Sequence, residues 1–291
     1  MQQFLDGQAR AKSAIQSEFD RIFAGLPSEP VHHAMAHAVL NGGKRLRGFL
    51  VLEGARLHDV DPARAILPAC AIEALHAYSL VHDDLPCMDD DDLRRGQPTV
   101  HVKWDEATAV LAGDALQTLA FELCADPAAG PAEVRADLCL TLARASGAQG
   151  MVYGQALDIA AETVDTPLTL EQINKLQDGK TGALIQWSAE AGARLAQADV
   201  TPLSTYANAL GLAFQIADDI LDETGDEAKA GKRLQKDAEA GKATFVSLLG
   251  LDGARQRATD LVTQACDALS PYGKQAESLR EAARFVISRE S

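Results

Sequence analysis

Apolar residues recur every three or four positions along most of the chain, the spacing that places side chains on one buried face of an α-helix. The clearest case lies between residues 203 and 221, where the spacing is kept by Leu203, Tyr206, Leu210, Phe214, Ala217 and Leu221. Comparable patterns predict helices over residues 10–24, 31–40, 63–82, 106–125, 132–160, 170–195, 243–269 and 275–289. Proline and glycine mark the short connections, and no convincing run of alternating β-branched residues occurs. We therefore predict an all-α protein whose residues 1–291 form a single-domain helical bundle.

Composition narrows the class of protein and its partners. The 291 residues are 47% hydrophobic, which is enough for a large core and excludes a disordered chain. The formal net charge of −15 and the pI near 4.8 argue against nucleic acid or an anionic membrane surface as a partner. An acidic protein that takes an anionic ligand needs metal ions to accept it.

The cysteines and the start of the chain both favour a cytoplasmic protein. The five cysteines show neither CxxC nor Cys/His ligand spacing, so we expect free thiols in a reducing cytosol. The first residues lack a basic stretch followed by an apolar run, so we expect no signal peptide. We also expect no membrane span and no stable membrane association, because no apolar run reaches about 18 residues.

Two groups of aspartates of similar design end apolar, helix-like runs. Their members are Asp83, Asp84 and Asp89 in the first group, and Asp218, Asp219 and Asp222 in the second. Carboxylates three or four residues apart share a helix face, so each group can direct several oxygens to one point. Hard cations such as Mg²⁺ bind such ligands and usually share them with substrate phosphates. Two such groups facing one another would hold a diphosphate through bridging metal ions.

Basic residues follow the first aspartate group directly. Pro86 cannot continue the helix, so the chain should turn there and bring Asp89 back toward Asp83. The next segment, Leu93-Arg94-Arg95-Gly96, places two arginines beside the aspartates. Guanidinium groups are the preferred bidentate donors to phosphate, so this sequel favours a phosphate site over a charged, solvated helix end.

The second aspartate group continues a polar stripe on an otherwise apolar helix. Gln215, Asp218 and Asp222 are spaced three and four residues apart and share one face. Buried carboxylates without partners are costly, so the stripe should line a cavity or bind a cation. A polar stripe toward solvent conflicts with the apolar residues on both sides.

A basic loop hinged by glycines lies earlier in the chain, at Gly42-Gly43-Lys44-Arg45-Leu46-Arg47. Glycine lets backbone approach a ligand closely, and Lys44 and Arg47 can grip a diphosphate, although a solvated basic loop is the alternative. The GxxxxGK[ST] spacing of a P-loop is absent. His76 lies seven residues before Asp83 on the same predicted helix face, where it can join an anion site.

Two further segments carry lysines of interest. Lys180-Thr181-Gly182 interrupts a helical pattern, and such a defect often marks a kink that exposes backbone carbonyls. Lys232 and Lys242 follow the second aspartate group in a glycine-rich segment. They fit a flap that closes on a phosphate, with flexible surface lysines as the alternative.

Several motifs occur in a characteristic order: GGKRLR, HDDLPCMDDDDLRRGQPT, GDAL, GQALD, DGKTGAL, QIADDILD and GKAT. With them the chain closely resembles the short-chain trans-prenyl diphosphate synthases from about residue 40 to 250, most of all the bacterial farnesyl diphosphate synthase type. The resemblance implies an all-α bundle around a deep central cavity, usually a homodimer. It also implies Mg²⁺-dependent head-to-tail condensation of isopentenyl diphosphate with dimethylallyl or geranyl diphosphate, by ionisation, condensation and elimination.

The resemblance also assigns roles to the residues above. Two or three Mg²⁺ ions, with Mn²⁺ as an alternative, would bridge the allylic diphosphate to the two aspartate groups. Isopentenyl diphosphate would be bound by Lys44, Arg47, His76 and Arg95. The allylic diphosphate would also contact Arg94, Lys180, Lys232 and Lys242. The Lys180 carbonyl, the Thr181 hydroxyl and the Gln215 amide would face the allylic cation.

Product length is expected to depend on the helix before the first aspartate group. Tyr78 lies five residues before Asp83, about 7.5 Å along a helix, and its phenol can fill a cavity floor. Ideal geometry stacks Ser79 more directly beneath Asp83, so the choice of Tyr78 follows from the resemblance, in which the fifth position upstream commonly gates chain length. The expected product is C15 farnesyl diphosphate, and an ordinary core tyrosine is the alternative.

Other activities share parts of this pattern. Geranylgeranyl diphosphate synthases have nearly every motif, so a C20 product stays open. A non-catalytic subunit of a heteromeric synthase should have degraded acidic or basic positions, and here both sets are intact. A terpene cyclase should lack the isopentenyl site of Lys44, Arg47 and Arg95.

Overall fold

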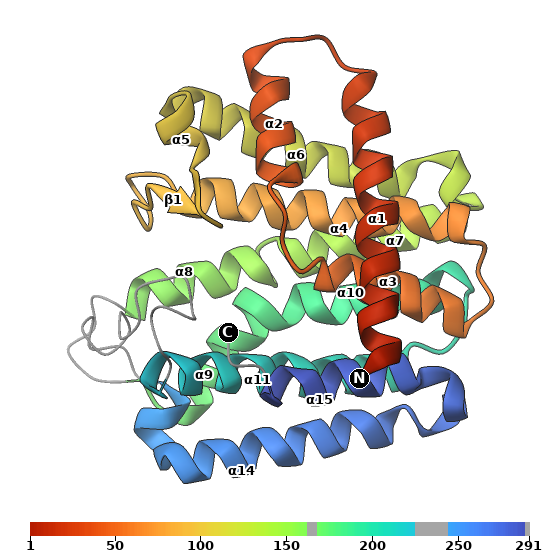
Figure 1. Cartoon of the computed structure of the whole chain (residues 1–291), viewed down its shortest axis with the longest axis vertical. Helices are drawn as coiled ribbons and strands as arrows, with labels where there is room; N and C mark the ends of the chain where they lie inside the picture. Colours follow the sequence, from red (N-terminus) through yellow and green to blue (C-terminus); the bar gives the residue numbers. More distant parts are fainter. Residues whose placement is uncertain (162–167, 225–243, 289–291) are drawn as a thin grey trace. The chain divides into compact units, whose positions relative to one another are not determined.

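The computed structural model describes residues 1–161, 168–224 and 244–288, and nearly all of their regular structure is helical, which confirms the all-α class (Figure 1). The α-helices are α1 (Gln2–Ala24), α2 (Pro30–Leu40), α3 (Leu46–Leu57), α4 (Pro62–Asp83), α5 (Val100–Lys103), α6 (Glu106–Ala125), α7 (Ala132–Ser146), α8 (Met151–Ala161), α9 (Leu170–Gln177), α10 (Ala183–Leu195), α11 (Thr201–Thr224), α14 (Phe245–Ala268) and α15 (Glu277–Ser288). Two 3₁₀ segments, η1 (Pro127–Ala129) and η3 (Ser270–Ala276), and a π-helical segment, η2 (Asp178–Gly182), complete the helical elements of the described residues. The strands β1 (Leu93–Arg94) and β2 (Gln97–Pro98) pair as an antiparallel hairpin.

Three of the differences between the observed and the expected helices have a clear physical cause. α3 was not expected, because it is apolar on nearly every side and therefore lacks the periodic polar face that marks a surface helix. The run expected over 132–160 is divided into α7 and α8 around Gly147 and Gly150. The run expected over 170–195 is interrupted by η2, where the backbone follows a π-helix.

The chain contains two compact units, which are named here by their larger parts. The N-terminal unit consists of Leu5–Leu140 with Ala191–Ala198, and the C-terminal unit of Met1–Phe4, Thr141–Glu190 and Asp199–Ser291. The division into two units does not decide whether residues 1–291 form one domain, so the single domain stays a prediction.

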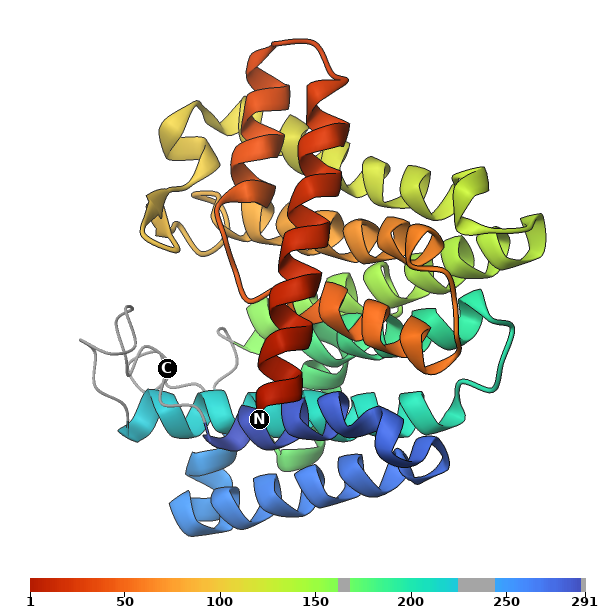
Figure 2. The same ribbon diagram turned by 45° about the vertical axis from the view of Figure 1, so that its right-hand side comes forward.

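α4 is the core helix of the N-terminal unit. Its start is set by Asp61, which accepts a hydrogen bond from the Ala63 amide at 2.9 Å, and by Pro62 in the first turn. It packs against α2, α3 and α6 and lies between α3 and α6 in both ribbon views (Figures 1 and 2). Contrary to our expectation from the sequence, α4 is long and apolar enough to cross a membrane. However, 72% of its most apolar stretch is buried inside the protein, which is typical of a core helix.

α11 organises the C-terminal unit by packing against α14 and α15. Tyr206 is fully buried in α11, and its hydroxyl donates to the Leu279 carbonyl at 2.9 Å. α14 begins with a capping box in which Thr244 and Ser247 exchange side-chain and backbone hydrogen bonds. This packing fixes the C-terminal half of α11, which carries the second aspartate group.

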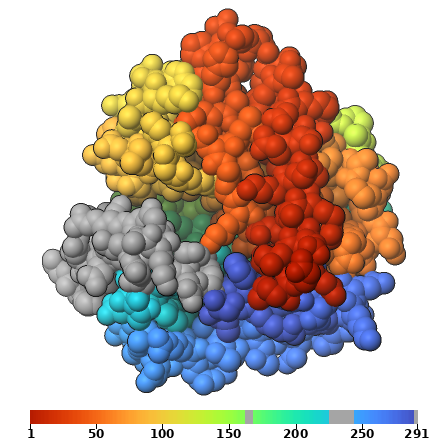
Figure 3. All heavy atoms as spheres, viewed as in Figure 1, coloured from red at the N-terminus to blue at the C-terminus, as the bar shows by residue number. Residues whose placement is uncertain are grey.

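The β-hairpin and α5 lie beside α2 at the surface of the N-terminal unit. The imidazole Nε2 of His37 on α2 is 2.9 Å from the Pro98 carbonyl of the hairpin. In the space-filling view the residues around the hairpin, in yellow, adjoin those of α2 (Figure 3). Leu93 at the start of the hairpin is 64% exposed. The hairpin is thus a surface element that contacts α2 through His37 and leaves Leu93 exposed to solvent.

Candidate active site

The first aspartate group caps the C-terminus of α4. The helix ends at Asp83, and the chain turns through Pro86 as expected from the sequence. The amide of Asp89 then donates to the Asp83 carbonyl at 2.8 Å, so the backbone returns to the helix end. The two aspartates, six residues apart in sequence, are neighbours in the fold.

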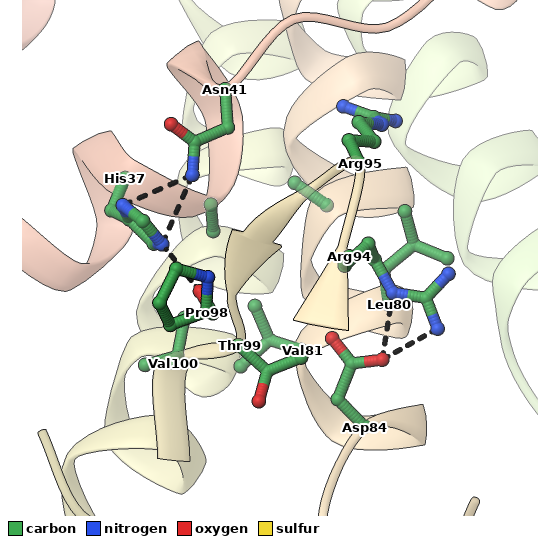
Figure 4. Close-up of a pocket in the computed structure, with 12 residues that line it drawn as sticks. His37, Asn41, Leu80, Val81, Asp84, Arg94, Arg95, Pro98, Thr99 and Val100 are labelled. Carbon is green, nitrogen blue, oxygen red and sulfur yellow. Dashed lines mark hydrogen bonds and ion pairs between the residues drawn. The ribbon is translucent and has the colours of Figure 1, made fainter. Parts of the chain in front are cut away.

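Asp84 forms an ion pair with an arginine of the hairpin. Its Oδ1 accepts from Arg94 Nε at 2.7 Å and lies 2.5 Å from Nη2 (Figure 4). Asp84 is 3% exposed, and burial raises the pKa of its carboxyl while Arg94 acts in the opposite direction. Asp91 lies further from the same guanidinium, at 3.6 Å. The predicted metal ligand and the predicted diphosphate ligand are therefore bound to each other in this structure.

No preassembled metal cage occurs in the parts of the chain that the structure describes. Within those parts, no three histidine, cysteine, aspartate or glutamate side chains are grouped so as to hold an ion. Mg²⁺ usually takes one or two carboxylates and completes its sphere with water and substrate phosphates. The oxygen donors of the aspartate groups suit that mode, and their role as metal ligands stays a prediction.

The glycine-hinged loop lies against Arg95. Arg95 Nη1 donates to the Gly42 carbonyl at 2.8 Å, and a Cβ atom at Gly43 would lie only 2.8 Å from the guanidinium carbon. Gly42 and Gly43 both have positive φ angles, of 84° and 104°. Glycine is needed here for the backbone conformation and for the close approach of the arginine.

A cluster of positive charge surrounds His76 in the N-terminal unit. Burial is the largest cause that lowers the pKa of the His76 imidazole well below its usual value, and Arg47, Arg95, Arg94 and Arg45 lower it further. Burial also lowers the pKa of the Arg47 guanidinium. Arg47 Nε is buried and has no hydrogen-bond partner among the described residues. Cationic donors gathered in this way favour an anionic ligand, and the cluster includes three of the four residues predicted for isopentenyl diphosphate.

The fourth member of that set, Lys44, lies in the same loop. Its carbonyl accepts from Gln8 Nε2 at 2.9 Å, and the residue is exposed. Gln8 on α1 therefore contacts the loop at Lys44, and Arg95 contacts it at Gly42.

The two residues predicted to control product length differ in their surroundings. Tyr78 is 8% exposed, and its ring meets His82 edge-on with centroids 5.2 Å apart. Burial raises the pKa of the Tyr78 phenol. Ser79 Oγ donates to the His76 carbonyl at 2.9 Å and so faces its own helix backbone. Tyr78 is therefore the bulkier and better-held side chain of the two.

In the C-terminal unit, Lys180 and Thr181 lie in the π-helical segment η2. Lys180 Nζ is 2.6 Å from Asp158 Oδ2 on α8. A Cβ atom at Gly154 would lie 2.0 Å from the Lys180 amide nitrogen, so α8 and η2 are in backbone contact. π-helical turns occur frequently at functional sites. The helical pattern is interrupted here by a π-helical segment, and the predicted kink with exposed carbonyls stays a prediction. Asp158 is a partner that residue reasoning missed, although its motif GQALD belongs to the resemblance.

The second aspartate group lies near the end of α11. Asp219 is 7% exposed and accepts from Gln215 Nε2 at 3.0 Å and from the Phe245 amide at 2.7 Å. Asp218 and Asp222 are half-buried on the face shared with Gln215. Lys232 and Lys242, predicted to reach a phosphate, lie outside the described residues.

A pocket opens behind the hairpin of the N-terminal unit (Figure 4). Apolar residues of α4 and α2 line part of it, and its polar wall is formed by His37, Asn41, Asp84, Arg94, Arg95 and Thr99. Asn41 Nδ2 lies 3.0 Å from the His37 ring, which in turn contacts the Pro98 carbonyl. Sequence reasoning did not select His37 or Asn41, because neither belongs to a charged motif.

Comparison with known proteins shows extensive similarity. A family model described as polyprenyl synthetase matches residues 28–282. The chain is 45% identical to the farnesyl diphosphate synthase of Escherichia coli (strain K12) in an alignment of 295 positions that covers 97% of each chain. It is 44% identical to the apo crystal structure of an FPP/GFPP synthase from Zymomonas mobilis, with a TM-score of 0.86 over 97% of this chain and 99% of that one. The crystal structure of a geranyltransferase from Helicobacter pylori, complexed with magnesium and isoprenyl diphosphate, is 35% identical. Its TM-score is 0.80, and the match covers 97% of this chain and 96% of that one.

Proposed function

The chain belongs to the polyprenyl synthetase family and is a prenyltransferase, and we propose that it makes farnesyl diphosphate. It would add isopentenyl diphosphate to dimethylallyl diphosphate and then to geranyl diphosphate, in head-to-tail order. The observation that best supports chain elongation is the cluster of Arg47, Arg95 and His76, in which His76 lies two turns before the end of α4. A second diphosphate site near the proposed metal-binding end of α4 would distinguish a chain-elongating enzyme from one that only ionises an allylic diphosphate.

The two aspartate groups would hold Mg²⁺, the ion present in the Helicobacter pylori relative. Bound Mg²⁺ would offset the negative charge that develops on the leaving diphosphate. We propose two or three ions, with Mn²⁺ as a substitute. In the first group Asp83, Asp84 and Asp89 would serve. In the second group Asp218 would serve together with Asp222 and Asp219, of which Asp219 already has a protein donor on each carboxylate oxygen.

The remaining residues would bind substrate and guide the reaction. Lys44, Arg47, His76 and Arg95 would fix isopentenyl diphosphate, and Arg94 and Lys180 would contact the allylic diphosphate, with Lys232 and Lys242 proposed from the sequence alone. The oxygens of Lys180, Thr181 and Gln215 would face the developing allylic cation, which preorganised dipoles stabilise without a nucleophile. Water must be excluded, because it would capture the cation before the isopentenyl double bond does.

Product analysis tests the proposal directly. Purified protein is incubated with Mg²⁺, isopentenyl diphosphate and one primer of C5, C10 or C15, and the dephosphorylated alcohols are separated by chromatography. A main product of C15 from the C5 and C10 primers supports the proposal. A main product of C20 supports a geranylgeranyl diphosphate synthase, and no product from any primer supports a non-catalytic subunit.

We further propose that the protein is a cytoplasmic homodimer. α6 leaves Val110 and Leu111 41% and 58% exposed. Neighbouring exposed apolar residues on one helix favour contact with another protein surface. Light scattering that gives twice the mass of the 30.9 kDa chain would support the dimer, and a monomer would contradict it.

A further inference from the structure

Glu73 is a buried carboxylate on α4 that does not belong to any of the predicted sites. It is 4% exposed, and both of its oxygens have partners in the basic loop region. Oε1 accepts from the Gly48 amide at 2.9 Å, and Oε2 is 3.2 Å from Arg45 Nη1. A charge this deeply buried is tolerated only when it is paired and hydrogen-bonded. One side chain therefore joins α4 to the loop and to the first turn of α3.

The start of α3 depends on this carboxylate because the helix has no cap of its own. The N-cap residue is Arg45, which has a left-handed φ of 49° and makes no side-chain cap hydrogen bond. The Gly48 amide belongs to the first turn, whose donors lack partners within the helix. Glu73 supplies both the missing acceptor and a negative charge at the positive end of the helix. Arg45 also donates to the Val39 carbonyl, which extends the connection to α2.

The loop held in this way carries two of the proposed ligands of isopentenyl diphosphate. Lys44 and Arg47 flank Arg45 in sequence, and His76 lies one helical turn after Glu73 on α4. The fit is close, because a Cβ atom at Gly48 would lie 3.3 Å from Glu73 Cγ. The position of these ligands is therefore set by a residue three turns before the aspartates.

We propose that Glu73 is a positioning residue for isopentenyl diphosphate. It orders the binding site of this substrate by fixing Arg45 and the first turn of α3. This inference rests on the proposed function, which assigns Lys44 and Arg47 to that substrate. Removing the negative charge of Glu73 has two opposite effects on the affinity for isopentenyl diphosphate. A more positive surrounding would by itself tighten the binding of a diphosphate, whereas a displaced loop would weaken it. The direction of the change therefore distinguishes positioning from simple electrostatics.

The principal test is the variant Glu73→Gln. Its KM is measured for isopentenyl diphosphate and then for geranyl diphosphate, with the other substrate kept at a fixed, saturating concentration. Its amide oxygen can still accept from Gly48, but its NH₂ group would face the Arg45 guanidinium, donor to donor. We expect the KM for isopentenyl diphosphate to rise about tenfold, the scale of one to two lost hydrogen bonds. The KM for geranyl diphosphate and kcat should stay within about twofold, because this residue makes no contact in the reaction.

Glu53→Gln is the matched control. Glu53 is also buried, at 5% exposure, and pairs with Arg56 at 2.8 Å within α3, away from the loop. Its replacement should lower Tm while leaving both KM values unchanged. A second variant, Arg45→Lys, keeps the buried charge but loses the forked guanidinium, and should raise the KM for isopentenyl diphosphate by about threefold.

Three outcomes would overturn the inference. A folded Glu73→Gln protein whose KM for isopentenyl diphosphate is unchanged or lower would do so, and so would an equal rise in Glu53→Gln. If Glu73→Gln fails to fold, an unchanged KM for isopentenyl diphosphate in Arg45→Lys would overturn the positioning role. Arg47→Ala separates this inference from the proposed function: if its KM for isopentenyl diphosphate is normal, the substrate site itself is wrong. If Arg47→Ala is impaired and Glu73→Gln is not, only the positioning role fails.

Discussion

The two aspartate groups look alike in sequence, yet their second members have different partners in the structure. Asp84 is paired with the side chain of Arg94, which comes from a surface hairpin. Asp219 instead accepts from the backbone amide of Phe245, the first residue of α14, and from Gln215. A side-chain partner can be exchanged for a metal ion and its diphosphate by rotating a few bonds. A backbone partner at a helix start cannot be exchanged without moving the helix.

The position of an aspartate within a DD motif therefore does not determine its role. Asp84 can change partners during binding, so its loss should mainly affect turnover. Asp219 connects α11 to α14, so its loss should mainly affect stability. The first members of the two groups, Asp83 and Asp218, are the ones for which we propose an equivalent role.

The largest effect is expected for those first members. Asp83→Ala and Asp218→Ala should each lower kcat by about 10²–10³-fold, the usual cost of removing one electrostatic group at a reacting centre. Activity should also disappear in EDTA and return with Mg²⁺, because carboxylates alone repel a diphosphate. Steady-state kinetics with and without chelator are the measurement. A nearly normal Asp218→Ala enzyme would show that the two groups are not equivalent.

The next test separates Asp84 from Asp219. Asp219→Ala leaves the buried Phe245 amide without its acceptor, which should lower the free energy of unfolding by about 1–3 kcal/mol and Tm by several degrees. Asp84→Ala should change Tm less, because Arg94 is 31% exposed, but it should lower kcat by about tenfold or more. Calorimetry and kinetics on both variants measure the two effects. A reversal, with Asp84→Ala the less stable protein, would contradict the comparison.

Replacement of Tyr78 should change the product more than the rate. Tyr78→Ala removes a buried phenol and should shift the main product from C15 toward C20, with kcat within about fivefold. Ser79→Ala is the control, because the Ser79 hydroxyl faces the helix backbone. Chromatography of the alcohols measures both variants. A wild-type product of C20, or a Tyr78→Ala enzyme that still stops at C15, would exclude Tyr78 as the gate.

The smallest effect concerns a thiol that only the first group contains. Cys87 is exposed in the turn after α4, whereas Cys70 and Cys124 are buried, and burial strongly raises the pKa of both thiols. Iodoacetamide at about pH 8 should therefore label Cys87 and spare the other two. Activity should fall about twofold, and Cys87→Ser should remove the sensitivity. Peptide mass spectrometry that finds Cys70 labelled first would contradict the assignment.

Much of the fold was predictable because most of its helices have one buried face. α11 shows this best, since the apolar residues that define its pattern include the buried Leu203, Tyr206 and Leu210. α3 was missed because burial on nearly all sides leaves no polar face to mark the period. The hairpin was missed because each of its strands has only two residues, too few for an alternation to appear.

The candidate site was predictable wherever its chemistry lies in charged motifs. Three of the arginines around His76 were selected from their sequence, Arg47, Arg94 and Arg95, whereas Arg45 was not. Partners that meet through folding left no local signal: Glu73 lies 28 residues from Arg45, and Phe245 lies 26 residues from Asp219. Such pairs depend on which helices pack together, and this is determined by the core rather than by the motif.

The π-helical segment Asp178–Gly182 also has a consequence for how this chain can change over generations. A π turn contains one residue more than the α-helix around it, so it behaves as a single-residue insertion. Deleting that residue would restore regular hydrogen bonding, but it would rotate all that follows by about 100°. Leu184, Ile185 and Trp187, which are buried just beyond it, would then point away from their present contacts. A change in the length of this segment would therefore require the helix after it to be repacked.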